Sequence, residues 1–166
     1  MRKVLLVISV LFAVPLFAQQ DPSKLQLSVF ATDPTYVQYS SGDSNFTMGL
    51  GAALEYRWNQ QWAIELQAAT QHHVRSEDSY PIDLLVHYRF QNASRWKPFL
   101  GAGVRYERSS SLRYDRREGP EIDGGVNFMI TPALSLRLDA KATMFFMRGG
   151  QSEFAVRPLI GFGWKF

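Results

Sequence analysis

The sequence predicts an all-β chain, an eight-stranded antiparallel up-and-down transmembrane β-barrel preceded by a cleaved signal peptide. Three observations support this fold class. The last thirteen residues, 154–166, alternate strictly between apolar and other side chains and end on an aromatic residue. Seven earlier segments show the same period of two, and the stretches between them are alternately long and short. A terminal strand with one apolar face invites pairing with other chains unless its edge is closed, as it is in a barrel.

The first eighteen residues have the pattern of a secretory signal peptide. Arg2 and Lys3 form a basic head, residues 4–17 form an apolar run, and a small residue precedes the polar segment that follows. The run is too short for a helix that spans a membrane. We therefore expect residues 1–18 to be removed and residues 19–166 to form one barrel domain.

Charge and cysteine content exclude several classes of function. The formal net charge is +3, but without the signal peptide 16 basic residues face 15 acidic ones, so no basic surface for nucleic acid is indicated. The chain has no cysteine, which excludes disulfides, cysteine-ligated metals and thiol nucleophiles. We expect no nucleic-acid partner, no cofactor and no metal centre.

The first two predicted strands flank a long polar segment. Alternation predicts strands at 25–31 and 46–58, and the residues between them, 32–45, contain Asp-Pro and Ser-Gly turn signals. Residues 59–61 form a tight turn. The second strand is the clearest, with large apolar residues on one face and glycine, alanine and charged residues on the other.

The third and fourth strands are separated by a charged loop. The strands are expected at 62–71 and 82–90, and the loop, 72–80, contains two histidines. The link 91–97 is the longest of the predicted short connections.

The fifth and sixth strands, at 100–107 and 121–128, surround a second charged loop at 108–119. This loop is rich in arginine. A Thr-Pro pair at 131–132 turns the chain after the sixth strand.

The last two strands are expected at 134–144 and 154–166, with a loop containing Gly-Gly at 147–153 between them. The terminal strand must pair with the first strand to close the sheet. The connections then alternate between long and short along the whole chain, which is typical of outer-membrane barrels with tight periplasmic turns and long outer loops. This predicts a location in the bacterial outer membrane with both termini in the periplasm.

The position of the large side chains indicates that the apolar face contacts lipid. A soluble ligand-carrying barrel also alternates, but it turns its apolar face inward. Here the glycines share the charged face, as a narrow lumen requires, and the tryptophans share the other. Aromatic residues also gather near strand ends, where an interfacial girdle lies. At the predicted periplasmic ends these are Tyr56, Trp58, Trp62, Tyr88, Phe90, Phe128, Phe162, Trp164 and Phe166. We expect outer-membrane lipid and lipopolysaccharide to surround a monomeric barrel.

The sequence resembles a known family, the small outer-membrane barrels of the OmpA transmembrane-domain and OmpX kind. The resemblance covers nearly the whole mature chain and includes the signal peptide, the eight strands, the stretch KPFLGAGVRY at 97–106 and the end GFGWKF. It implies that the barrel-assembly machinery reads the terminal aromatic and the alternate apolar residues before it. In this chain those residues are Ile160, Phe162, Trp164 and Phe166.

The inward face is predicted to carry a balanced set of acids and bases. Its members are Glu55, Arg57, Glu65, Asp83, His87, Arg89, Arg105, Glu107, Glu121, Asp123, Arg137, Asp139, Lys141, Arg157 and Lys165. Buried charges persist when they are paired and hydrogen-bonded, so the first hypothesis is an ion-paired network that fills the lumen. A second hypothesis is that the network leaves or gates a narrow channel for ions or small polar solutes.

Two further functions depend on the predicted loops. His72, His73, Asp78 and Ser79 share one loop and include the residue types of a lipid A-modifying barrel enzyme, although that motif spacing is not recognisable. Residues 108–118 are rich in arginine and tyrosine and suit recognition of lipopolysaccharide phosphates or of an external partner. The favoured expectation is a non-enzymatic integral membrane protein with structural or recognition roles and with no catalytic residues.

Overall fold

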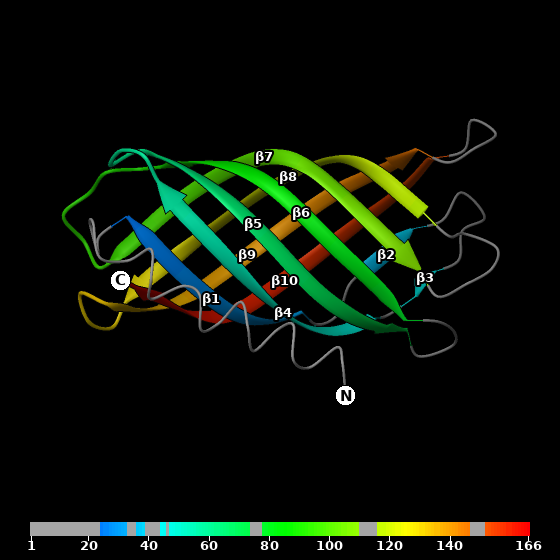
Figure 1. Ribbon diagram of the computed structural model, residues 1–166, viewed down its shortest axis with the longest axis horizontal. Helices are drawn as coiled ribbons and strands as arrows, with labels where there is room; N and C mark the ends of the chain where they lie inside the picture. Colours follow the sequence, from blue (N-terminus) through cyan, green and yellow to red (C-terminus); the bar gives the residue numbers. More distant parts are fainter. Residues whose placement is uncertain are drawn as a thin grey trace.

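The computed structural model is a closed antiparallel barrel of tilted strands (Figure 1). It describes residues 24–32, 36–38, 44–45, 47–73, 78–109, 116–146 and 152–166. The predicted signal peptide, 1–18, lies outside these described residues. Within them there is no helix of the length and apolarity needed to cross a membrane.

Eight long strands of the described chain form the wall. They are β1 (Leu25–Thr32), β4 (Thr47–Arg57), β5 (Trp62–His73), β6 (Ser79–Arg89), β7 (Trp96–Ser109), β8 (Arg116–Met129), β9 (Leu134–Phe146) and β10 (Ser152–Lys165). Each pairs antiparallel with the next, and β1 also pairs with β10. The predicted eight-stranded closed sheet is therefore confirmed, including the pairing of the terminal strand with the first.

Two short strands lie in the segment that the sequence predicts as a long loop. These are β2 (Tyr36–Gln38) and β3 (Ser44–Asn45), which pair with each other. β2 also pairs with Phe154–Val156 of β10, beyond Leu159, where the β1 register ends. It therefore continues the place of β1 along β10 and lengthens the wall at that end of the barrel.

The strands extend further than the sequence predicts at the end with the longer connections. The predicted loop at 108–119 is wrong in extent, because β7 runs to Ser109 and β8 begins at Arg116, with Arg108 paired to Arg116. Backbone pairing continues there although the side chains on both faces are polar, so hydrophobic alternation gives no signal. We call this end of the barrel the loop end. The opposite end, which carries the three short connections, the start of β1 and the end of β10, is the turn end (Figure 1).

The inward and outward faces follow the predicted parity. Along β6 and β10, buried and exposed residues alternate, and the exposed ones are mainly large and apolar. The inward face also contains apolar side chains of some size among its charges, notably Phe30, Leu85, Phe99 and Phe145. Glycines make room for two of them, because Gly51 lies against Phe30 and Gly125 lies against Phe99.

The Phe30 contact gives a first prediction. A Cβ on Gly51 would lie 2.5 Å from Cε2 of Phe30 and 2.8 Å from the carbonyl oxygen of Ala68. Gly51→Ala is therefore expected to destabilise the barrel by about 1–3 kcal/mol through overpacking, measured by urea unfolding in lipid vesicles. Gly124→Ala is the control, because its Cβ would meet mainly Cδ2 of the exposed Leu100, at 3.0 Å. Equal stabilities of the two variants would contradict the role given to Gly51.

Candidate functional site in the barrel lumen

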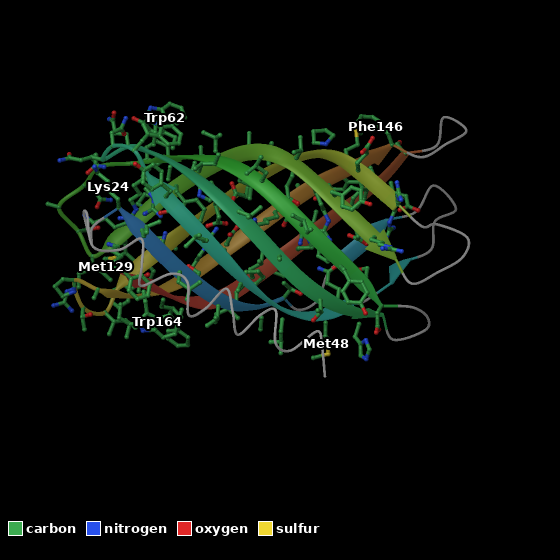
Figure 2. All side chains as sticks on the ribbon, in the orientation of Figure 1. Lys24, Met48, Trp62, Met129, Phe146 and Trp164 are labelled. Atoms are coloured by element: carbon green, nitrogen blue, oxygen red, sulfur yellow. The ribbon has the colours of Figure 1, made fainter. Side chains whose placement is uncertain are left out.

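Ionisable side chains fill the interior of the barrel. Of the fifteen residues predicted for the lumen, thirteen are buried, and Arg57 and Lys165 are half-buried. They reach the interior because each occupies the inward parity of its strand, where lipid is excluded. The sides of the barrel carry the apolar residues, as Figure 2 shows for Trp62, Trp164 and Phe146.

Near the turn end, the network is centred on Glu55. Its carboxylate accepts from Nη2 of Arg89 at both oxygens and from Nε of Arg57 at 2.9 Å. Nη2 of Arg57 also donates to Oε1 of Gln26 at 2.6 Å. Two guanidinium groups thus share one buried carboxylate.

His87 connects this cluster to the middle of the lumen. Its Nδ1 lies 3.4 Å from Oε2 of Glu55, and its Nε2 lies 2.9 Å from Oδ2 of Asp123. A ring nitrogen facing a carboxylate on each side is best satisfied when both nitrogens carry protons.

Arg137 occupies the middle of the lumen. It bonds to both oxygens of Glu65 and to Oδ2 of Asp139, the latter at 2.7 Å. Its guanidinium also lies 4.9 Å from the ring centroid of Phe99. Glu65 is on β5 and Arg137 is on β9, four places apart in the closed order, so this pair joins opposite walls.

A second group of charges lies beside it. Nη2 of Arg157 is 2.5 Å from Oε2 of Glu121 and 3.2 Å from Oδ2 of Asp83. The ammonium of Lys141 lies 3.6 Å from Glu121 and 3.8 Å from Asp83. Arg157 is on β10 and Asp83 is on β6, so this contact also crosses the lumen.

At the loop end, the network includes two residues that sequence reasoning missed. Arg117 bonds to Glu107 at 2.6 Å and to Glu153 at 2.8 Å, while Arg105 bonds to Glu107 from the other side. Phe145 lies under Arg117, 5.2 Å from ring centroid to guanidinium carbon. Both Arg117 and Glu153 fall in segments that the sequence predicts as loops. On both strands, β8 and β10, the inward residues have odd sequence numbers. Continuing this alternation towards the loop would have assigned Arg117 and Glu153 to the inner face.

Lys165 stands apart from the network. Its Nζ contacts the thioether Sδ of Met129 at 3.4 Å. No ion pair joins it to a carboxylate within the described residues. Lys165 therefore lies on the same face as the predicted network but makes no ion pair with its members among the described residues.

Three members of the network could also be considered as metal ligands. One ligand atom each from Glu55, Glu65 and His87 lies within 4.8 Å of the others. Both carboxylates already accept from guanidinium groups, those of Arg89 and Arg137. A cation would have to compete with these fixed positive charges, so the arrangement fits an ion-paired network better than a ligand set.

Strand geometry separates His72 from Ser79, two of the residues considered for enzyme chemistry, whereas the side chain of His73 lies outside the described structure. His72 is exposed and pairs with Asp78, whereas Ser79 is buried and bonds through Oγ to Gln71. Ser79 pairs with Gln71 across the sheet, so the two side chains lie on the same face. His72 follows Gln71 on β5, and its side chain therefore points to the opposite face.

The terminal strand presents its alternate residues outward. Ile160, Phe162 and Trp164 are exposed on the side of the barrel, and the N–H of Phe166 donates to the carbonyl of Leu25 at 3.0 Å. These four residues are the predicted insertion signal, and they lie at the seam where β10 meets β1.

Comparison with known proteins gives a family and several related folds. Among solved structures, Neisserial surface protein A has a TM-score of 0.74 at 18% identity, covering 86% of this chain and 97% of its own. The attachment invasion locus protein Ail of Yersinia pestis has a TM-score of 0.63 at 11% identity, with coverages of 87% and 99%. The outer membrane enzyme PagL has a TM-score of 0.60 at 17% identity, with coverages of 82% and 97%. At these identities the likeness shows the fold alone. A search of curated proteins found no match.

The family is shown by a match over nearly the whole chain. A sequence model described as the outer membrane protein beta-barrel domain matches residues 4–166. The closed eight-stranded sheet and the related outer-membrane barrels agree with it. This protein is an outer-membrane β-barrel protein, and its chain belongs to the outer membrane protein beta-barrel domain family.

Proposed function

We propose that this protein is a non-enzymatic outer-membrane barrel whose lumen is closed by its ion-paired network and which acts through its surface. The observation that carries the proposal is that ion pairs join opposite walls. Arg137 reaches Glu65, and Arg157 reaches Asp83, from strands four places apart. A solute passing through the barrel would have to separate these pairs, which is costly in a low-dielectric interior.

We also propose an orientation and an assembly route for the barrel. The short connections and the described ends of the chain lie at the turn end, which we assign to the periplasm by the usual asymmetry of such barrels. Residues 1–18 would direct export and be removed, and the barrel-assembly machinery would receive the terminal strand. We propose that the folded chain is a monomer surrounded by lipid and lipopolysaccharide.

The loop end supports a recognition role. Arg108 and Arg116 are cross-strand neighbours, and both are exposed on the outer side of the wall next to the exposed Tyr106. In the proposed orientation they lie at the level of the lipopolysaccharide phosphates. Guanidinium groups bind phosphate oxygens in bidentate fashion, so this patch suits contacts with the surrounding glycolipid.

The closed lumen predicts the outcome of an electrical measurement. Planar-bilayer recording of refolded protein is expected to show no discrete conductance steps. The double variant Asp83→Ala with Arg157→Ala is the comparison, because it removes one contact between opposite walls and is expected to show openings. Reproducible openings of the unmodified protein would instead favour the second candidate, a narrow channel for ions or small polar solutes.

The separation of His72 from Ser79 argues against a catalytic pair made of these two residues. Nucleophilic catalysis needs a base within hydrogen-bond reach of the nucleophile, and these two side chains lie on opposite faces of the wall. PagL has a similar fold and is an enzyme, so the fold by itself does not decide the matter.

A further inference from the structure

The turn end of the barrel contains a cavity lined by basic side chains. It has a volume of about 350 Å³ and is lined by Lys24, Arg57, Asn59, Gln60, Arg89, Phe90, Gln91, Lys97 and Lys165. Figure 2 shows Lys24 and Met129, the neighbour of Lys165, at this same end. Its size is at the lower end of the roughly 300–1,000 Å³ typical of ligand pockets. We call it the turn-side cavity.

The fold brings these five cations together from separate parts of the chain. Lys24 precedes β1, while Arg57, Arg89 and Lys165 are the last residues of β4, β6 and β10. Lys97 is the second residue of β7. Because strand ends meet in a ring at the mouth of a barrel, residues far apart in sequence line one opening.

The cavity is rich in positive charge, and its other polar lining residues are the uncharged Asn59, Gln60 and Gln91. No acidic residue is among those that line it. Glu55, deeper in the lumen, is the carboxylate that pairs with Arg57 and Arg89. Lys97 donates to the backbone oxygen of Asn92 at 2.5 Å, and Lys165 donates to a thioether sulfur, which is a weak acceptor.

Arg89 is the most buried of the cationic residues that line the cavity. The residue is 7% exposed, and its Nε has no hydrogen-bond partner within the described structure, as is also the case for Nη1 of Arg105 at the loop end. Burying a donor without a hydrogen-bond partner costs folding free energy. Like charges gathered in one partly enclosed opening also repel one another more strongly than they would in water.

The loop end offers a contrast within the same barrel. There Arg105 and Arg117 alternate with Glu107 and Glu153 in a chain of direct ion pairs. Arg105 and Arg117 are therefore neutralised by the protein itself. At the turn end, Lys97 and Lys165 make no ion pair with a carboxylate within the described residues, and an external anion would supply one.

We propose that the turn-side cavity binds an anion that carries phosphate groups. Arg57 and Arg89 are already held from behind by Glu55 and Gln26, so little ordering is needed when an oxyanion arrives. Guanidinium groups suit two oxygens of one phosphate, and lysine ammonium groups add compact charge around it. The phosphate belongs either to a soluble diphosphate or to the headgroup of an anionic phospholipid at that mouth.

The test is calorimetric titration of inorganic pyrophosphate into the full barrel, reconstituted in phosphatidylcholine nanodiscs. The unmodified protein is expected to bind, and Lys97→Gln with Lys165→Gln is expected to weaken the affinity by at least about tenfold. Arg95→Gln is the matched control, because Arg95 is an exposed basic residue of the same end that does not line the cavity. It is expected to leave the affinity unchanged.

Two results would overturn the proposal. One is the absence of binding by the unmodified protein. The other is an equal loss in the Arg95→Gln variant, which would show general attraction to a basic surface. Since Lys165 lies in the terminal strand, Lys97→Gln alone is measured as well, and it is expected to weaken binding by about threefold or more.

A second arm identifies the source of the phosphate. The titration is repeated in nanodiscs that contain phosphatidylglycerol. If the lipid headgroup occupies the cavity, the apparent pyrophosphate affinity of the unmodified protein falls while that of the double lysine variant does not. If a soluble anion is the ligand, the affinity of the unmodified protein keeps its advantage over the double variant in both lipids.

Discussion

Arg137→Met is expected to lower the free energy of unfolding by about 3–5 kcal/mol, because it leaves Glu65 and Asp139 buried without the guanidinium group that they share. Methionine keeps most of the apolar volume next to Phe99, so the loss reports mainly the uncompensated charges. Urea unfolding in phosphatidylcholine vesicles, followed by tryptophan fluorescence, measures it. Arg95→Met, at an exposed position, is the control and is expected to change little.

A triple variant separates charge from packing in this prediction. Glu65→Gln and Asp139→Asn, added to Arg137→Met, remove the carboxylates' charges and keep their shapes. Most of the lost stability is then expected to return, since a neutralised buried cluster no longer holds unpaired ions. A triple variant as unstable as the single one would show that Arg137 acts through its shape and not through its charge.

The faces of the strands are predictable from the sequence because alternation is a local property. A residue such as Glu65 is assigned to the lumen by the parity of its own strand, without knowledge of any other strand. The same reasoning placed Arg157 on the inner face, and its side chain is 1% exposed. Pairing of the first and last strands was also predictable, because a closed sheet leaves no other partner for either edge.

The partners across the lumen are not predictable in this way. Parity gives the face of a side chain but not its height in the barrel, which depends on strand tilt and stagger. Arg157 thus contacts Asp83 and Glu121, whereas parity alone allows any acid of the inner face. The same limit applies to the turn-side cavity, whose cations come from five separate strand ends.

The sequence does not predict how far β7 and β8 extend at the loop end, and the reason here is different. Arg117 faces the lumen and Arg116 faces outward, so polar residues occupy both faces and the alternation disappears. Backbone pairing between β7 and β8 continues through this region without a hydrophobic signal. Phe30 and Phe99 show the converse, since they are large apolar residues on the inner face and fit only beside glycines of neighbouring strands.

Deletion of Phe166 is expected to reduce the amount of folded barrel in the outer membrane several-fold, because the terminal strand is proposed to be the part that the assembly machinery receives. In the folded barrel, Phe166 follows the end of β10 and contributes one backbone bond, to Leu25. Its removal should therefore cost little stability once the sheet has closed. Heat-dependent gel migration of the membrane fraction measures the folded amount, since a closed barrel migrates differently before and after boiling.

The control for this deletion is Phe146→Ala, which removes an exposed aromatic at the opposite end of the barrel. Both variants are also refolded into lipid vesicles without any cellular machinery, where they are expected to fold as well as the unmodified chain. A defect of the Phe166 deletion in cells but not in vesicles separates delivery from stability. Equal defects in both settings would mean that Phe166 matters for closing β10 against β1, and normal insertion in cells would contradict a role in either step.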